Sequence, residues 1–240
     1  MKIRNRVFVK DHLEIGLTLT LDQRAAHYLF NVLRCQEDEY ISIFNESTEW
    51  LSKIDKINSK DVQISIEKNI KSADKRKDIT LYFSPIKKNQ TELVIQKCTE
   101  IGVTNFQPVL MERTNFSSFN IDRLSLIAIE AIEQSEQMKI PSIFEPIKFE
   151  ELLSRDQKDH ITLVCSVGEN NNSIKNVLKN HSASNYSLLV GPEGDFSETE
   201  MNNLKNKENY FTVSLGDSVL KSETASIVAA GILKDCLQND

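Results

Sequence analysis

Two short stretches near the end of the 240-residue chain combine glycine, hydroxyl and charged residues in a way that could do chemistry. The first, Gly191-Pro192-Glu193-Gly194, directly follows the apolar run YSLLV. The second, Lys221-Ser222-Glu223-Thr224, precedes a run of small and apolar residues. Glycine lets a backbone approach a ligand closely, a carboxylate can accept a proton, and an ammonium group can stabilise developing negative charge. These stretches are therefore the first candidates for a binding or catalytic site.

Each stretch also has a purely structural explanation. Ser197 with Glu200 three residues later matches a capping box, and Ser222 or Thr224 can cap the last helix. The patterns GxGxxG and GxxxxGK are absent, which argues against dinucleotide or nucleoside-triphosphate binding. Capping does not explain why two strand–glycine–helix junctions lie about 25 residues apart. If the two strands end on the same edge of a parallel sheet, their junctions would wall a single ligand pocket.

The elements that must position these junctions alternate along the chain after residue 78. Short apolar runs alternate with helical patterns, which indicates an α/β domain with a mainly parallel sheet. The expected strands are 79–83, 106–110, 161–165, 186–190 and 211–215. The expected helices are 91–101, 121–135, 172–180, 197–207 and 222–237.

The first third of the chain has a different texture. Strand-like runs such as RVFV, YISIF and VQISI surround one helical stretch at 22–34, which predicts a small β-rich module. The polar segment 71–78 reads as an exposed connection. We therefore expect two domains, at 1–72 and 79–240.

Composition excludes several classes of protein. No stretch approaches the roughly 18 apolar residues of a membrane span, and the N-terminus lacks the apolar core of a secretion signal. The four cysteines lie far apart and without clustered histidines, so we expect neither a metal site nor disulfides. Free thiols are typical of the cytoplasm.

Charge is unevenly distributed. Residues 1–72 hold eleven basic and eleven acidic side chains, whereas residues 79–240 hold 15 basic and 22 acidic. With a net charge of −6, any contact with nucleic acid must be local. Lys2, Arg4 and Arg6 alternate, so on a strand they would share one face, and we expect that face to contact RNA phosphates.

Five blocks of the sequence, in order along the whole chain, resemble the RsmE family of the SPOUT superfamily. The blocks are HYLFNVLR (27–34), KKNQTELVIQKCTEIGV (87–103), EQSEQMKIP (133–141), GPEGDFSETE and LGDSVLKSETA. Members of this family methylate N3 of a uridine in 16S ribosomal RNA of the small subunit. The resemblance implies a PUA-like β-barrel for RNA binding, an α/β domain with a trefoil knot, S-adenosylmethionine as methyl donor, and a homodimer.

By position, the resemblance also implies the site residues. Cofactor-binding residues would be Ser166, Val167, Val190, Gly191, Pro192, Gly194, Leu215, Gly216, Val219 and Leu220. The family usually has arginine where this chain has Gln137, Ser218 and Lys221, and glycine where it has Asp195. Because arginine is a bidentate phosphate donor, these departures put full-rate RNA methylation in doubt. Other basic residues would then have to hold the RNA: Arg4, Arg6, Arg34 and Lys87.

Methylation of N3 requires removal of its proton, and Glu193 and Glu223 are the only acids within the two key stretches. Lys221 would stabilise the negative charge that develops on the uracil oxygens. Two alternatives remain open at this point. The chain could be a non-catalytic or weakly active RNA-binding or ribosome-assembly factor that retains the cofactor fold, or a transfer RNA methyltransferase with the same knot. No metal is expected.

Overall fold

The computed structural model describes residues 5–73, 77–115, 118–155, 159–167 and 172–238. The chain forms two compact units. The first comprises residues 1–75 and also 132–140, and the second comprises 76–131 and 141–240. The segment 132–140, which the expected boundaries assigned to the second domain, therefore packs with the first.

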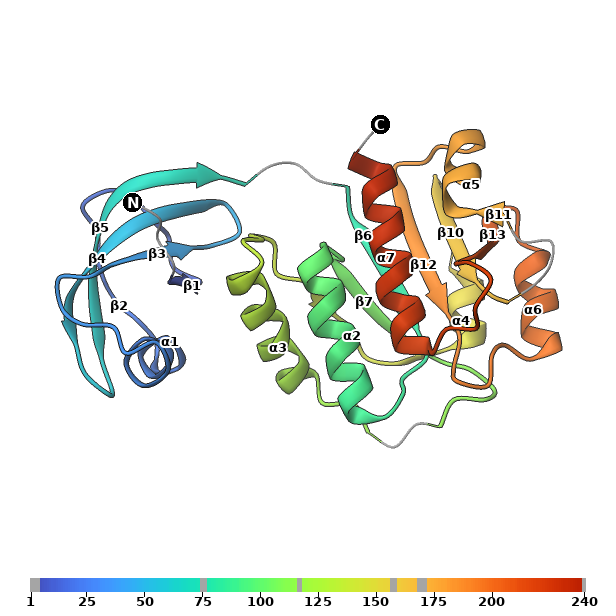
Figure 1. Ribbon diagram of the computed structural model, residues 1–240, viewed down its shortest axis with the longest axis horizontal. Helices are drawn as coiled ribbons and strands as arrows, with labels where there is room; N and C mark the ends of the chain where they lie inside the picture. Colours follow the sequence, from blue (N-terminus) through green and yellow to red (C-terminus); the bar gives the residue numbers. More distant parts are fainter. Residues whose placement is uncertain (1–4, 74–76, 116–117, 156–158, 168–171, 239–240) are drawn as a thin grey trace. The chain divides into compact units, whose positions relative to one another are not determined.

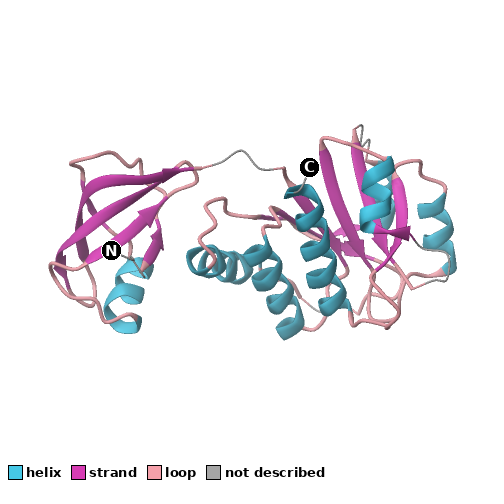
Figure 2. Cartoon of the chain, turned by 45° about the horizontal axis from the view of Figure 1, so that its top comes forward, coloured by secondary structure: helices cyan, strands magenta, loops and turns pink. Residues whose placement is uncertain are grey.

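The first unit is built on a five-stranded sheet with the order β1-β3-β4-β5-β2, in which only β1 and β3 run parallel (Figure 2). One face of the sheet and the helical segment enclose a core that includes Leu29, Ile41, Ile43, Ile54 and Ile64. The strands are β1 (Arg6–Phe8), β2 (Thr18–Thr20), β3 (Tyr40–Phe44), β4 (Thr48–Ile57) and β5 (Val62–Ser72). Successive side chains of each strand point alternately to the buried and to the exposed face of the sheet, which accounts for the period of two in the sequence.

The helical segment of this unit is shorter and less regular than the expected helix 22–34. Asp22 caps α1 (Gln23–His27) by accepting a hydrogen bond from the amide of Ala25. A single π-helical turn, η1 (Tyr28–Val32), then widens the helix. Arg34 ends it with a φ of 56°, in the left-handed region. Hydrophobic spacing alone does not distinguish an α-turn from a π-turn, so the irregularity was not foreseeable.

Arg6 does not take the place predicted for it. Its side chain is buried, with 8% exposed, and its guanidinium binds both oxygens of Glu49 at 2.9 and 3.1 Å. It also donates to the carbonyls of Ile132 and Gln137 and stacks on the ring of Phe44. The guanidinium of Arg6 is therefore not available to RNA phosphates, and the prediction that it contacts them was wrong. The alternation of basic residues gave no sign of the buried carboxylate of Glu49, which lies 43 residues along the chain. Lys2 and Arg4 lie outside the described residues.

The second unit is an α/β domain with the sheet order β11-β13-β10-β12-β6-β7-β8, and β9 pairs with β7 (Figure 1). All of its paired strands run parallel. The strands are β6 (Ile79–Phe83), β7 (Asn105–Leu110), β8 (Ser142–Ile143), β9 (Ile147–Lys148), β10 (His160–Cys165), β11 (Asn172–Ser173), β12 (Asn185–Val190) and β13 (Tyr210–Ser214). The five strands expected from sequence are present within one residue at each end.

Helices cover both faces of this sheet, which explains the near-continuous apolar runs. Alternate residues such as Leu81 and Leu163 pack with α2 (Lys88–Ile101), α3 (Ile121–Gln134), α5 (Ile174–Asn180) and α7 (Ser222–Gln238). Their neighbours Tyr82 and Val164 pack with α4 (Phe149–Ser154) and α6 (Glu198–Lys205). The short α4, β8 and β9 were not predicted, because segments of two to six residues carry little periodicity. None of the helices in the described ranges has the length and apolarity to cross a lipid bilayer.

The register of the sheet brings several loops together at one edge. Val190, the last residue of β12, pairs with Phe83 of β6 and with Cys165 of β10, and Cys165 pairs with Val213 of β13. The loops that follow β13, β10, β12 and β6 therefore leave the sheet side by side, in that order. This is the edge where open parallel sheets bind ligands.

Candidate active site at the carboxyl edge of the sheet

A pocket of about 860 Å³ lies where these loops leave the sheet. Both stretches singled out in the sequence line it, together with the loop after β10 and the start of α2. Nine of the ten residues expected to bind the cofactor are in its walls: Ser166, Val167, Val190, Gly191, Pro192, Leu215, Gly216, Val219 and Leu220. Gly194, the tenth, does not line it.

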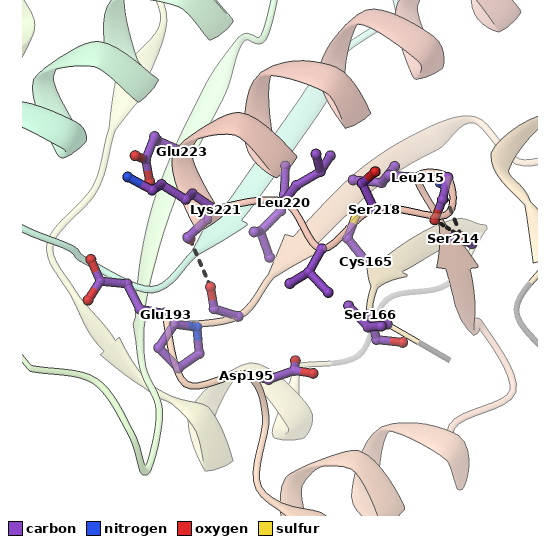
Figure 3. Close-up of a pocket in the computed structure, with 18 of the residues that line it drawn as sticks. Cys165, Ser166, Glu193, Asp195, Ser214, Leu215, Ser218, Leu220, Lys221 and Glu223 are labelled. Atoms are coloured by element: carbon purple, nitrogen blue, oxygen red, sulfur yellow. Dashed lines mark hydrogen bonds between the residues drawn. The ribbon is translucent and has the colours of Figure 1, made fainter. Parts of the chain in front are cut away.

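A buried hydrogen bond ties the two junctions to each other. The hydroxyl of Ser222, on the first residue of α7, donates to the carbonyl of Gly191 at 2.9 Å (Figure 3). The sequence suggested Ser222 as one of two possible caps of the last helix. Its hydroxyl instead binds a different loop. Its hydroxyl fixes the start of α7 against the loop that follows β12, so the two walls of the pocket hold one position relative to each other.

The two glycines of the first stretch serve packing rather than close approach of a ligand. A Cβ on Gly191 would lie 3.1 Å from the ring of Phe196, which is part of the core under the loop. A Cβ on Gly194 would press on the side chain of Arg113, whose guanidinium donates to the Gly194 carbonyl at 2.6 Å. A Gly191→Val substitution would therefore disturb the loop itself and would not report cleanly on ligand binding.

One end of the pocket is apolar. Val167 and Val219 are 67% and 79% exposed, unusual values for valine, and both face this space together with Leu215 and Leu220. Gly216 adopts a φ of +123°, which few residues other than glycine tolerate. The hydroxyl of Ser214 braces this turn by contacts with the Gly216 amide and carbonyl at 3.2 and 3.1 Å.

The other end of the pocket is charged. Figure 3 shows Glu193, Lys221 and Glu223 toward one end, with Ser214, Leu215 and Ser218 toward the other. Lys87, which immediately precedes α2, also lines the pocket. Within the described part of the chain, none of these four charged side chains forms an ion pair. Two cations and two carboxylates at this end thus face the space without neutralising one another, and Asp195 and Asp217 add two further carboxylates to the lining.

Several pocket residues were not predicted from the sequence, among them Cys165, Gln90, Ser214 and Asp217. Cys165, at the end of β10, is buried, and burial raises the pKa of its thiol to about 12, so the thiol stays protonated and is a poor nucleophile or metal ligand. Gln90, in the first turn of α2, contributes an amide. Gln90 belongs to the block KKNQTELVIQKCTEIGV, which was recognised as similar to the family. The parallel pairing of β6 with β12 is what brings that block to the pocket.

The departures from the family pattern fall in different places. Asp195 adopts a φ of 59°, so a glycine at this position would be relaxed, and the aspartate is accommodated by accepting a hydrogen bond from the Phe196 amide. Ser218 and Lys221 line the pocket. Gln137 lies in the first unit, where its carbonyl accepts a hydrogen bond from Arg6.

The two remaining described residues that were predicted to bind RNA belong to different units. Arg34 is exposed in the first unit, whereas Lys87 belongs to the pocket of the second. Across the described residues there is no group of three histidine, cysteine or carboxylate side chains that could hold a metal ion.

Comparison with known proteins identifies relatives over the whole chain. A family model for an RNA methyltransferase domain matches residues 73–234, and one for an RNA methyltransferase PUA domain matches residues 21–67. The ribosomal RNA small subunit methyltransferase E of Rickettsia conorii is 30% identical, covering 94% of this chain and 93% of its own.

Solved structures agree in fold. The ribosomal RNA small subunit methyltransferase E from Neisseria gonorrhoeae, described as bound to S-adenosyl methionine, matches with a TM-score of 0.88 and 24% identity, over 96% of this chain and 97% of its own. A probable rRNA-methyltransferase from Porphyromonas gingivalis matches with a TM-score of 0.82 and 25% identity, over 98% and 99%. The resemblance drawn from five sequence blocks is confirmed: the chain belongs to the RNA methyltransferase family whose members include ribosomal RNA small subunit methyltransferase E.

Proposed function

We propose that this protein transfers a methyl group from S-adenosylmethionine to N3 of a uridine in 16S RNA of the small ribosomal subunit. One observation carries the proposal: a single pocket has an apolar end with exposed valines and a charged end whose lysines and glutamates form no ion pair with any described residue. Relatives named as small-subunit ribosomal RNA methyltransferases, one of them described with S-adenosyl methionine bound, support the same assignment.

The apolar end fits the adenosine part of the cofactor. Exposed Val167 and Val219 would be covered by a flat ring, which removes apolar surface from water. The loop backbone at Leu215 and Gly216 offers N–H and C=O groups to the ring edge. When bound, S-adenosylmethionine supplies an electrophilic methyl group on a sulfonium ion.

The charged end accounts for the remaining chemistry. The neutral imide nitrogen of uracil is a poor nucleophile, so a carboxylate within hydrogen-bonding distance must take its proton, and Glu193 or Glu223 is the candidate. Lys221 would donate to a uracil oxygen as negative charge develops there. Both groups line the same pocket, so a bound base would meet the carboxylate and the lysine together, which favours reaction by positioning. The target base must also leave its stack to enter.

The proposal includes the wider setting of the reaction. The protein would act as a homodimer in the cytoplasm, on ribosomal RNA, without a metal. Exposed apolar side chains on α2 and α7, which pack together, support a contact with a second copy: Leu93 and Ile232. A trefoil knot is part of the same proposal, supported by membership of the RNA methyltransferase family, for which the sequence blocks imply this knot. Sedimentation equilibrium would test the dimer.

The decisive experiment is methyl transfer to small subunits from a strain that lacks the modification. We expect incorporation of one labelled methyl group per subunit, recovered as 3-methyluridine after digestion. Binding of subunits without transfer would instead favour the assembly-factor alternative, which the loss of arginine at Ser218 and Lys221 first suggested.

Cofactor binding is tested separately by calorimetry with S-adenosylmethionine. Val219→Asp places a charge in the apolar end and should weaken binding at least tenfold, whereas the protein should remain folded because the side chain is exposed. Val32→Asp, at an exposed valine of the first unit, is the matched control and should bind normally. Equal affinities for the two variants would remove this pocket from the proposal.

A further inference from the structure

Gln90 is the feature of the pocket that the proposed function does not yet use. Its side chain lines the pocket from the first turn of α2 and is half-buried. In the described part of the chain it forms no hydrogen bond with another side chain or with the backbone. A half-buried amide that faces a cavity without a partner has donors and an acceptor available for a ligand.

The register of the sheet decides at which end of the pocket Gln90 lies. The loop that leads to α2 leaves β6 next to the loop that leaves β12, and the amide of Ser84 donates to the carbonyl of Val190 at 3.1 Å. The apolar end is formed by the loops of β10 and β13, on the far side of β12. Gln90 therefore belongs with the charged end, alongside Glu193 and Lys87.

We propose that Gln90 contacts the substrate and positions the target uracil by donating a hydrogen bond to one of its carbonyl oxygens; this inference rests on the proposed function. Around N3, uracil presents an N–H donor flanked by two carbonyl acceptors. Cytosine presents an amino donor in place of one of those acceptors. The charged end offers the complementary set: carboxylate acceptors on Glu193 and Glu223, and donors on Lys221 and Gln90.

The size and charge of the pocket support a base at this end in addition to the cofactor. A volume of 860 Å³ is near the upper limit of the roughly 300–1,000 Å³ typical of sites for one small molecule. Lysine has donors and no acceptor, so Lys221 and Lys87 would both reject the amino group of cytosine. The amide of Gln90 adds a further donor beside these two ammonium groups.

The test compares substitutions at Gln90 that keep or remove the donor. Gln90→Ala and Gln90→Glu remove it, whereas Gln90→Lys keeps it. Gln96→Ala, on the exposed side of the same helix, is the matched control. Each variant is assayed for S-adenosylmethionine affinity by calorimetry, and for kcat/KM on unmodified small subunits at saturating cofactor.

We expect kcat/KM to fall about tenfold in Gln90→Ala and further in Gln90→Glu, and to stay within threefold of wild type in Gln90→Lys and Gln96→Ala. Affinity for S-adenosylmethionine should stay within threefold in all four. A loss of kcat/KM smaller than threefold in Gln90→Ala would overturn the inference alone. A larger loss of cofactor affinity in that variant would also overturn it, because Gln90 would then contact the methyl donor. A wild-type protein that transfers no methyl group would overturn the proposed function as well.

Discussion

The two units of this protein use the same charged residue types in opposite ways. In the first unit, Arg6 and Glu49 are 8% and 6% exposed, and each of the three guanidinium nitrogens of Arg6 donates at least one hydrogen bond. Nearby, Glu133 is 4% exposed and accepts from the Phe8 amide and from Arg24. In the second unit, Glu193, Lys221 and Glu223 face an open pocket, and no other charged group in the described residues pairs with them.

Structural and functional charges are distinguished here by whether they have partners within the protein. A buried charge is tolerated only when it is paired and hydrogen-bonded, so the first cluster is satisfied within the protein itself. Charges that lie in a cavity without partners remain available to a ligand. We call Arg6, Glu49 and Glu133 the closed cluster, and Glu193, Lys221 and Glu223 the open cluster. The substitutions below test whether the two clusters differ in their effects on stability and activity.

The largest effect is expected from opening the closed cluster. Arg6→Ala leaves Glu49 buried without its main partner, which should lower the free energy of unfolding by about 3–5 kcal/mol. Denaturant unfolding, followed by circular dichroism, measures it. Lys53→Ala removes the exposed ion pair with Asp38 and is the control, with an expected loss below about 1 kcal/mol. Equal losses for the two variants would show that the buried cluster is not special.

The next effect concerns the open cluster and should leave stability unchanged. Lys221→Ala should lower methyl transfer to small subunits at least tenfold, or about 1.4 kcal/mol of barrier, because its ammonium contacts charge that develops only in the transition state. Unfolding and S-adenosylmethionine affinity should match wild type. Lys221→Arg, which restores the usual residue of the family, should keep or raise activity. Normal turnover of Lys221→Ala under saturating RNA would remove Lys221 from the mechanism.

Acid should destabilise the first unit through Glu49. Burial by itself would raise the pKa of Glu49, but hydrogen bonds from Arg6 and Ser42 and the charges of Arg6 and Lys71 outweigh it and hold the pKa below its ordinary value of 4.5. The stability contributed by this carboxylate is therefore complete above that value and is lost as the pH falls through the lower folded-state pKa. In Glu49→Gln, the free energy of unfolding should change less than in wild type between about pH 5 and about pH 3. Parallel pH profiles for the two proteins would contradict this account.

The smallest effect concerns RNA binding and compares a cation without a partner with a cation that already forms an ion pair. Arg34 is exposed and unpaired in the described residues, so Arg34→Ala should flatten the dependence of log Kd on log salt by about 0.7–0.9. Lys53→Ala serves again as control, because Lys53 already binds Asp38 at 2.6 Å. Filter binding with a 16S RNA fragment across a salt series measures both slopes. If neither slope changes, the RNA contact lies elsewhere.

Much of the fold was predictable because its signals are local. Apolar runs and helical spacing placed all five central strands of the second unit, and Ser197 with Glu200 forms the expected capping box. Both stretches of the candidate site were also found, since glycine and charge directly after an apolar run are visible without a structure. Family resemblance, rather than periodicity, supplied the nature of the ligand.

What the sequence could not supply depends on distant partners. Arg6 looked like part of a basic arm because Glu49 and the carbonyls of 132–137 are far away along the chain. Gln90 lay just outside the expected helix 91–101, and the pairing of β6 with β12 is what brings it to the pocket. The glycine at 191 suggested a close ligand, whereas the ring of Phe196 is what excludes a side chain there.

The membership of residues 132–140 in the first unit bears on how such a protein can be rearranged. A gene segment that encodes only residues 1–75 omits the carbonyls of Ile132 and Gln137 and the carboxylate of Glu133. The polypeptide it specifies would contain an arginine that keeps Glu49 but lacks two carbonyl acceptors, and a backbone amide whose acceptor is encoded elsewhere. We therefore expect the N-terminal unit to be a poor cassette for domain shuffling: recombination at the linker would separate it from part of its own interior, and inheritance of the two units together is favoured.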